Sequence, residues 1–307
     1  MSYTPTHFRL PPNGILVRDD QAEPRVEPYL FDDAIAIALD VALATDRPLL
    51  VSGEPGCGKS RLAEAFAAVQ GWNLLAQTIT SRTRIETLTA EVDQLRRLND
   101  AQARGPDDRL KPPACYLNPG LFWWAYAPDS ARRRGLSDDE AATHGVELPY
   151  PGTRRDAPGQ PQAATVLLID EIDKAEPDLP NDLLEPLDRR RFDLPDGFPV
   201  ANGRQIAAPT TDPGFRLLTL ITTNGERDLP QAFLRRCVRL DLPDPTPERL
   251  IQIGEQHYPP GDDPQARKRI AAIARLIDAF RAPAKDSRQR RLPGLRPGGG
   301  GALGPAD

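Results

Sequence analysis

The segment Gly53–Ser60, GEPGCGKS, constrains the fold of this chain more than any other feature. The apolar run PLLVSG (Pro48–Gly53) precedes it, and an amphipathic helical pattern (Ser60–Gln70) follows it. It matches GxxxxGK[ST], in which glycines let consecutive backbone N–H groups turn inward around phosphate oxygens. The lysine reaches the β- and γ-phosphates, and the following helix directs its positive N-terminal end at the same anion. We therefore expect a nucleotide-phosphate loop rather than a tight turn that ends in a solvated lysine.

Within this segment we expect the nucleotide to contact each residue from the strand end to the first turn of the helix. Lys59 would bind the phosphates, and the Ser60 hydroxyl would be a ligand of Mg²⁺. Cys57 occupies a free position of the pattern. A redox switch is one interpretation, but a filler is the better one, because an unpaired thiol there needs no role. The predicted phosphate-loop residues are Gly53, Glu54, Pro55, Gly56, Cys57, Gly58, Lys59, Ser60 and Arg61.

Further apolar runs recur along the chain, at Asn73–Thr80, Thr165–Glu171, Phe215–Asn224 and Cys237–Pro243. Those that begin at Pro48, Thr165 and Phe215 are almost continuously hydrophobic, as is typical of strands covered on both faces of a parallel sheet. Helical patterns alternate with the runs, at residues 32–45, 60–70, 84–99 and 182–190. This alternation predicts an α/β fold with a doubly wound, parallel five-stranded sheet.

Two more helices are predicted after the fifth run, and they would form a small, truncated α-helical lid. Thr246 and Pro247 open a helix that runs to His257, and Asp263 and Pro264 repeat this signal before a helix at about 265–281. We expect four parts: an N-terminal extension (1–27), an α/β nucleotide-binding core (28–244) with an insertion at about 125–163, a partial helical lid (245–282) and a disordered Gly/Pro-rich tail (283–307).

Polar side chains follow two of the predicted strands. The run TVLLIDE delivers Asp170 and Glu171 at a strand's carboxyl end, where Asp170 would hold the Mg²⁺ shell and Glu171 would polarise the water that attacks the γ-phosphate. The run LLTLITTN ends in Asn224. A strand between the phosphate-loop strand and the Asp-Glu strand would place that amide beside the attacking water, although strands also end in asparagine for the sake of a turn.

Two arginines, Arg235 and Arg236, close the segment LPQAFLRRC. A guanidinium neutralises the charge that develops on a γ-phosphate, whether it comes from the same chain or from a neighbouring subunit. Two surface arginines at the end of a helix are the alternative, because they interact favourably with the helix dipole. The chemistry of the residues leaves both alternatives open.

Composition excludes several classes of protein. The chain has 39 Lys and Arg residues against 44 Asp and Glu residues, a net charge of −5, which argues against a protein that coats nucleic acid or an anionic membrane. Its cysteines, Cys57, Cys115 and Cys237, form no CxxC pair, so we expect neither a disulfide framework nor a zinc site. The N-terminal residues contain no apolar core of signal-peptide length, and the longest apolar stretch, Ala34–Ala44, is interrupted by Asp40 and too short to span a bilayer. We therefore expect a soluble, cytoplasmic protein.

Taken in order, the motifs GEPGCGKS, LLIDEIDKA, NDLLEPLDRRRFDLP, LITTNGE and LPQAFLRRCVRLDLP resemble those of an AAA+ ATPase of the P-loop NTPase superfamily, most specifically its MoxR-like branch. The resemblance covers roughly residues 28–258. It implies ATP and Mg²⁺ as cofactors. It also implies a homo-oligomeric ring, typically a hexamer, because the arginine finger of this family acts on a neighbouring subunit. Position by position it implies Walker A at Lys59 and Ser60, Walker B at Asp170 and Glu171, sensor 1 at Asn224 and the finger at Arg236.

The chain departs from the family pattern in two places. The segment 122–163 is longer and richer in proline, and its aromatic residues would form either a gripping surface or, more commonly, a helix buried against the core. The lid lacks a further helix, since Pro293 and Pro297 forbid one, and Arg288 is the only candidate for a remnant of the sensor 2 arginine. The aromatic residues are Phe122, Trp123, Trp124 and Tyr126.

The resemblance implies Mg²⁺-dependent ATP hydrolysis by an oligomeric, chaperone-like motor that remodels an unidentified protein client. One alternative is a nucleotide-gated assembly switch with little or no turnover, because its lid is incomplete. A nucleic-acid motor is the third reading; the acidic balance and the lack of a recognisable DNA-binding module count against it.

Overall fold

The computed structural model describes residues 5–22, 25–103, 111–155, 164–198, 203–209, 211–212, 214–261 and 263–289. The chain divides into two compact units, one that ends at Asp244 and one that begins at Pro245. Within the described ranges, no helix combines the length and the apolar character that crossing a membrane requires.

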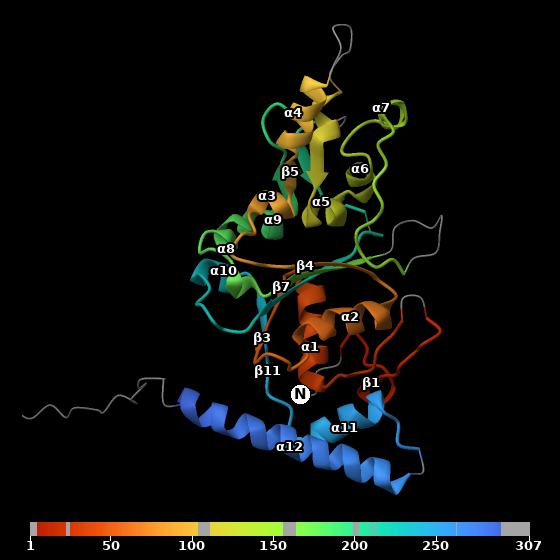
Figure 1. The fold of residues 1–307 in the computed structure, drawn as a ribbon, viewed down its shortest axis with the longest axis vertical. Helices are drawn as coiled ribbons and strands as arrows, with labels where there is room; N and C mark the ends of the chain where they lie inside the picture. Colours follow the sequence, from red (N-terminus) through yellow and green to blue (C-terminus); the bar gives the residue numbers. More distant parts are fainter. Residues whose placement is uncertain are drawn as a thin grey trace, which may run out of the picture. The chain divides into compact units, whose positions relative to one another are not determined.

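A five-stranded sheet forms the centre of the first unit, with the strand order β11–β3–β10–β7–β4 (Figure 1). Every neighbouring pair in it is parallel, so the predicted doubly wound α/β fold is confirmed. The expected position of β10, between β3 and β7, is also found. The strands are β3 (Leu49–Gly53), β4 (Asn73–Thr78), β7 (Thr165–Asp170), β10 (Leu217–Thr223) and β11 (Val238–Leu242).

Both faces of this sheet are buried, which is why its strands read as nearly continuous hydrophobic runs. Successive side chains of a strand point to opposite faces. Val166 and Leu168 of β7 therefore join one core, and Leu167 and Ile169 join the other. Figure 1 shows the helices α1 and α2 on one side of the sheet and α5 on the other. These helices are α1 (Asp33–Thr45), α2 (Lys59–Gln70) and α5 (Leu121–Tyr126).

The aromatic cluster of α5 is part of the second core. Phe122, Trp123, Trp124 and Tyr126 are all 5% exposed or less. The Trp123 ring lies 6.4 Å from the Phe192 ring, and the Tyr126 hydroxyl donates to the Pro186 carbonyl at 2.7 Å. The packing interpretation of these residues is therefore confirmed, and they form no gripping surface.

The helix predicted over 84–99 is wrong. Two helices, α3 (Ile85–Leu88) and α4 (Gln94–Gln102), flank a short strand, β5 (Ala90–Val92), which pairs antiparallel with β6 (Leu117–Pro119). The Asp93 carboxylate accepts from the backbone N–H of Arg96 at 2.8 Å and caps the new helix. The apolar residues that suggested one helix therefore belong to three separate elements, α3, β5 and α4.

Several shorter elements complete the first unit. The helix predicted at 182–190 is divided into α8 (Leu179–Asp182) and α9 (Leu184–Arg189). The remaining helices are α6 (Pro128–Arg132), α7 (Asp138–His144), α10 (Gln231–Leu234) and the 3₁₀ turns η1 (Pro12–Gly14), η2 (Pro113–Tyr116) and η3 (Ile172–Lys174). Two further antiparallel pairs are short. One joins β1 (Ile15–Leu16) to β2 (Tyr29–Leu30), and the other joins β8 (Arg191–Asp193) to β9 (Gln205–Ala207).

The outer side of β4 carries one further contact. Leu74 and Thr153 exchange two backbone hydrogen bonds, at 2.9 and 2.8 Å. A Cβ atom at residue 152 would lie 2.2 Å from the Leu74 carbonyl oxygen, so only glycine allows this approach.

The second unit consists of α11 (Pro247–His257) and α12 (Pro264–Gln289). Thr246 caps α11 as expected, and Gly254 of α11 lets Ile270 of α12 approach closely, because a Cβ there would lie 2.7 Å from Ile270 Cγ2. The helix α12 ends at Gln289 and so runs past Pro283, beyond its predicted end. The tail after Gln289 and the side chain of Arg288 lie outside the described residues.

Candidate functional site

A glycine-rich loop joins β3 to α2 and ends in the first turn of that helix. Gly53 closes β3 with φ +154°, and a Cβ there would lie 2.6 Å from the Leu242 carbonyl oxygen. Gly58, the N-cap of α2, has φ +99°, a conformation that favours glycine. Because glycine offers no capping side chain, the N–H groups of the first helical turn stay open to an anionic ligand.

Lys59 lies folded against this loop. It is 7% exposed, and its ammonium donates to the carbonyl oxygens of Gly53 at 2.8 Å and Glu54 at 3.0 Å. These are uncharged acceptors, which an anion of higher charge would replace. The loop therefore holds a buried cation beside open backbone donors.

The acidic end of β7 meets the start of α2. The Ser60 hydroxyl donates to Asp170 Oδ1 at 2.8 Å, and the Thr222 hydroxyl, at the end of β10, donates to the same oxygen at 2.5 Å. Two segments that are far apart in the sequence thus place a hydroxyl and a carboxylate in direct contact.

Glu171 directly follows β7 and has an unusual backbone. Its φ of +61° and ψ of +49° are left-handed, a conformation that costs a non-glycine residue energy and is often found at functional sites. The Glu171 N–H donates to Thr222 Oγ1 at 2.9 Å, which holds this conformation. Its carboxylate accepts from the Asn224 side chain at 3.4 Å through Oε1 and from Lys174 at 2.7 Å through Oε2. The hydrogen bond from Lys174 to this carboxylate raises the pKa of Lys174.

Asp173 positions the segment that carries Asn224. Its side chain is 3% exposed, and its Oδ2 accepts from the backbone N–H groups of Asn224 at 3.0 Å and Glu226 at 2.9 Å. A buried carboxylate that receives two backbone donors fixes a loop firmly, because losing it would leave those donors unpaired.

Arg236 lies elsewhere. It precedes β11, whose first residue, Val238, pairs with Leu49 at the start of β3, whereas the glycine-rich loop follows the end of β3. A strand of this length separates the two ends by roughly 13 Å. Arg236 forms an ion pair with Asp188 and donates to the Ala232 carbonyl at 2.9 Å. The structure therefore does not bring Arg236 to Lys59 within one chain, and the adjacent Arg235 is exposed.

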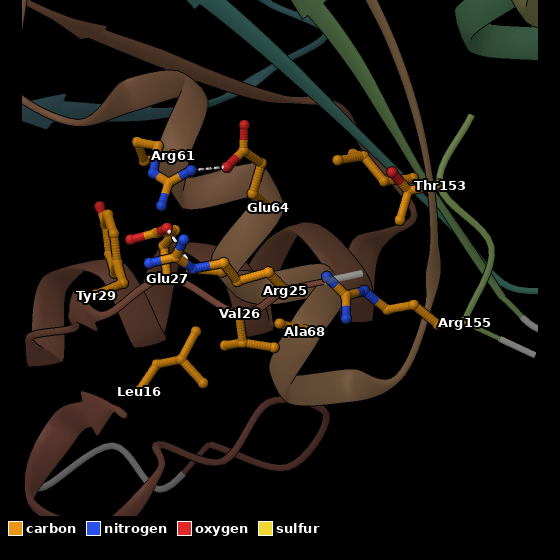
Figure 2. Close-up of a pocket in the computed structure, with 12 residues that line it drawn as sticks. Leu16, Arg25, Val26, Glu27, Tyr29, Arg61, Glu64, Ala68, Thr153 and Arg155 are labelled. Atoms are coloured by element: carbon orange, nitrogen blue, oxygen red, sulfur yellow. Dashed lines mark hydrogen bonds and ion pairs between the residues drawn. The ribbon is translucent and has the colours of Figure 1, made fainter. Parts of the chain in front are cut away.

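The predicted residues thus fall into three groups. Ser60, Asp170, Glu171 and Asn224 are joined by hydrogen bonds, directly or through Thr222, and Lys59 directly precedes Ser60 with its ammonium on the glycine-rich loop. Arg236 is at the opposite end of the strands, and Arg61 pairs with Glu64 on the side of α2 (Figure 2). Sequence reasoning missed Thr222, Asp173 and Lys174. The pairs Thr-Thr before Asn224 and Asp-Lys after Glu171 were the available signals.

The oxygen donors at this site suit a hard cation that is also coordinated by water and by phosphate oxygens. Among the described residues, no group of three or more His, Cys, Asp or Glu side chains could hold a metal ion. The Ser60 hydroxyl and the Asp170 carboxylate are oxygen donors of the kind that Mg²⁺ uses together with water and phosphate oxygens. The arrangement can therefore bind a phosphate chain, and it holds a carboxylate and an amide beside it.

The family model of the AAA domain (dynein-related subfamily) matches residues 48–108 and 125–237. These two ranges make up more than half of the chain, and they contain the glycine-rich loop, the acidic end of β7, Asn224 and Arg236. No curated protein matches the chain at a significant level.

Proposed function

The chain belongs to the AAA domain family, in its dynein-related subfamily, and from this premise we propose that it binds ATP with Mg²⁺ and hydrolyses it. The observation that carries the proposal is the contact of 2.8 Å between the Ser60 hydroxyl and Asp170. It joins the phosphate-binding loop to the acidic strand end, and phosphoryl transfer in P-loop enzymes needs both at one place.

Lys59, Ser60 and Asp170 would hold the substrate. Lys59 would exchange its two carbonyl acceptors for phosphate oxygens, which are stronger acceptors for an ammonium group. Ser60 and Asp170 would hold Mg²⁺, which neutralises phosphate charge when bound. The open N–H groups at the start of α2 would bind the remaining phosphate oxygens.

Glu171 and Asn224 would act on the attacking water. Glu171 would accept its proton or orient it, and Asn224, 3.4 Å from Glu171, would fix the carboxylate and the water relative to each other. Asp173 would support this arrangement by accepting a hydrogen bond from the backbone N–H of Asn224. Positioning and charge neutralisation, rather than covalent chemistry, would supply the rate enhancement.

Arg236 would complete the site of a neighbouring copy. Its position at the far end of the strands from Lys59 supports a role away from its own loop, and a guanidinium supplied by a neighbour is an established way to stabilise charge on a γ-phosphate. We propose a homo-oligomeric ring, typically a hexamer, of MoxR-like type that remodels a protein client. The motif order supports the MoxR-like assignment.

A nucleotide-gated switch is the second candidate, because both carboxylate oxygens of Glu171 are already engaged. In that case ATP would bind and promote assembly, with little or no phosphate release.

One set of measurements tests the proposal. The wild type and the Glu171→Gln, Lys59→Ala and Glu176→Gln variants are compared for binding of a fluorescent ATP analogue and for steady-state phosphate release with Mg²⁺. We expect Glu171→Gln to bind but not turn over, and Lys59→Ala to lose binding. Glu176→Gln, an exposed carboxylate five residues further on, should match the wild type. Equal turnover by all four proteins would refute the site, and tight binding without turnover by the wild type would favour the switch.

A further inference from the structure

A polar cavity lies beside α2, and it is lined by residues other than those that form the candidate site. It has a volume of about 140 Å³ and is bordered by α2, by Leu16, residues 25–27 and Tyr29, by Leu74 of β4, and by Thr153 and Arg155. Figure 2 shows its lining, with Arg155 extending from its segment toward the α2 residues Glu64 and Ala68. Lys59, Ser60, Asp170 and Glu171 are not among its lining residues.

Three arginines from three different segments line this cavity: Arg25, Arg61 and Arg155. Two of them have carboxylate partners. Arg25 lies 2.7 Å from Asp20 and 3.1 Å from Glu27, and Arg61 forms an ion pair with Glu64. The lining itself holds three arginines and two carboxylates, those of Glu27 and Glu64, and Arg155 forms an ion pair with neither.

Arg155 has no such partner in the part of the chain that the structure describes. Its Nε is buried and makes no hydrogen bond. Burial lowers the pKa of Arg155, and the charge of Glu64, which is already paired with Arg61, is the influence that opposes this. A guanidinium nitrogen withdrawn from water without an acceptor is unfavourable, so the site favours an anion that supplies one.

The shape of the lining selects among anions. A planar carboxylate accepts one guanidinium fork, whereas a tetrahedral phosphate presents oxygens in several directions and can accept from arginines on different sides. The volume of about 140 Å³ leaves room for one such group together with water. Apolar side chains such as Leu16, Val26 and Leu74 complete the lining and strengthen the attraction by lowering the local dielectric.

We propose that this cavity binds the phosphate group of a small anionic ligand, with Arg155 as the principal ligand and Arg25 and Arg61 in support. The proposal does not depend on ATP hydrolysis. It concerns a site distinct from the glycine-rich loop, although Arg61 directly follows Ser60 in the sequence. A test must therefore separate phosphate bound in the cavity from phosphate bound at that loop.

The test uses the full chain with Lys59→Ala, which weakens phosphate binding at the loop, and titrates it with inorganic phosphate by calorimetry. Arg155→Met is then added in one protein and Arg154→Met in another. Arg154→Met is the matched control, because it removes the same charge from a neighbouring residue. Arg154 is exposed and its guanidinium lies 5.4 Å from the centre of the Tyr150 ring. We expect Arg155→Met to weaken phosphate binding at least about tenfold, the value of a lost charged hydrogen bond, and Arg154→Met to leave it unchanged.

Two further measurements cover other outcomes. Acetate should bind much more weakly than phosphate. In the otherwise unchanged wild type, the Nε–H resonance of Arg155 should shift and saturate with phosphate, a readout that needs no destabilising substitution. Equal phosphate affinity in the Arg155→Met and Arg154→Met proteins, acetate binding as strong as that of phosphate, or an Arg155 resonance that does not move would each overturn the proposal.

Discussion

Lys174 and Glu171 are joined by an ion pair of 2.7 Å, one turn apart at the end of β7. The other oxygen of the same carboxylate accepts from Asn224 at 3.4 Å. Each carboxylate oxygen can accept more than one hydrogen bond, so a water molecule can join Asn224 at Glu171 but must compete there with the charged Lys174. The shorter contact, to Lys174, is the one that holds it back.

Replacing Lys174 by alanine should raise kcat. The carboxylate would be free to contact the attacking water, and the gain should be modest, about two- to fivefold, because pairs that reach solvent are weak. The KM for ATP should not change, since Lys174 contacts Glu171 and not the phosphate loop. Steady-state ATPase assays measure both constants. Lys174→Arg, which keeps the pair, is the control and should behave as the wild type; a lower kcat for Lys174→Ala would mean that Lys174 aims Glu171 instead of restraining it.

Asp173 should be required for both stability and turnover. Asp173→Ala leaves the N–H groups of Asn224 and Glu226 unpaired, so the free energy of unfolding should fall by about 2–4 kcal/mol. The kcat should fall as well, because Asn224 loses its support. Urea unfolding and ATPase assays measure the two effects. Asp173→Asn keeps one acceptor oxygen and should lose less of each; a normal kcat in Asp173→Ala would contradict a positioning role.

Arg236 should act on a neighbouring copy. The Arg236→Ala protein and the Lys59→Ala protein should each be inactive alone. In an equal mixture, about a quarter of the contacts would combine an intact loop with an intact arginine, so about a quarter of the wild-type ATPase rate should return. Arg235→Ala should stay active and serves as the control. Mixtures that remain inactive, under conditions in which wild-type subunits exchange, would rule the mechanism out.

Cys57 should react slowly with alkylating agents at neutral pH. Burial raises the pKa of its thiol, and the opposing charge of Lys59 does not cancel this. The thiolate, which is the reacting form, is therefore scarce at pH 7.5, and the alkylation rate should rise about tenfold per pH unit up to and above pH 9. Mass spectrometry after iodoacetamide treatment measures it, with Cys57→Ser as the control. ATP with Mg²⁺ should protect Cys57, and rapid labelling at pH 7 would contradict the prediction. Cys237 is buried, and burial raises its pKa to about 12, so it should not compete.

The parallel sheet and the meeting of Ser60 with Asp170 could be predicted from the sequence because both follow from local patterns. A strand that is buried on both faces has a hydrophobic signature, and the carboxyl ends of parallel strands lie at one edge. The β5 strand could not be predicted in this way, since it depends on pairing with Leu117–Pro119, which the spacing of Leu88 and Leu95 does not reveal. The roles of Asp173 and Thr222 were also hidden, because each depends on a hydrogen bond to a residue about fifty positions away.

The pairing of Leu74 with Thr153 affects the tendency of this protein to aggregate. A border strand with unsatisfied backbone groups is a template on which another polypeptide can extend the sheet, and this is a common route to aggregation. Here the bridge to Thr153 satisfies the outward backbone N–H and C=O of Leu74 in β4, and it can form only because Gly152 has no side chain. A methyl group at that position would push Thr153 away from Leu74 and leave this part of the β4 edge open to pairing with another polypeptide.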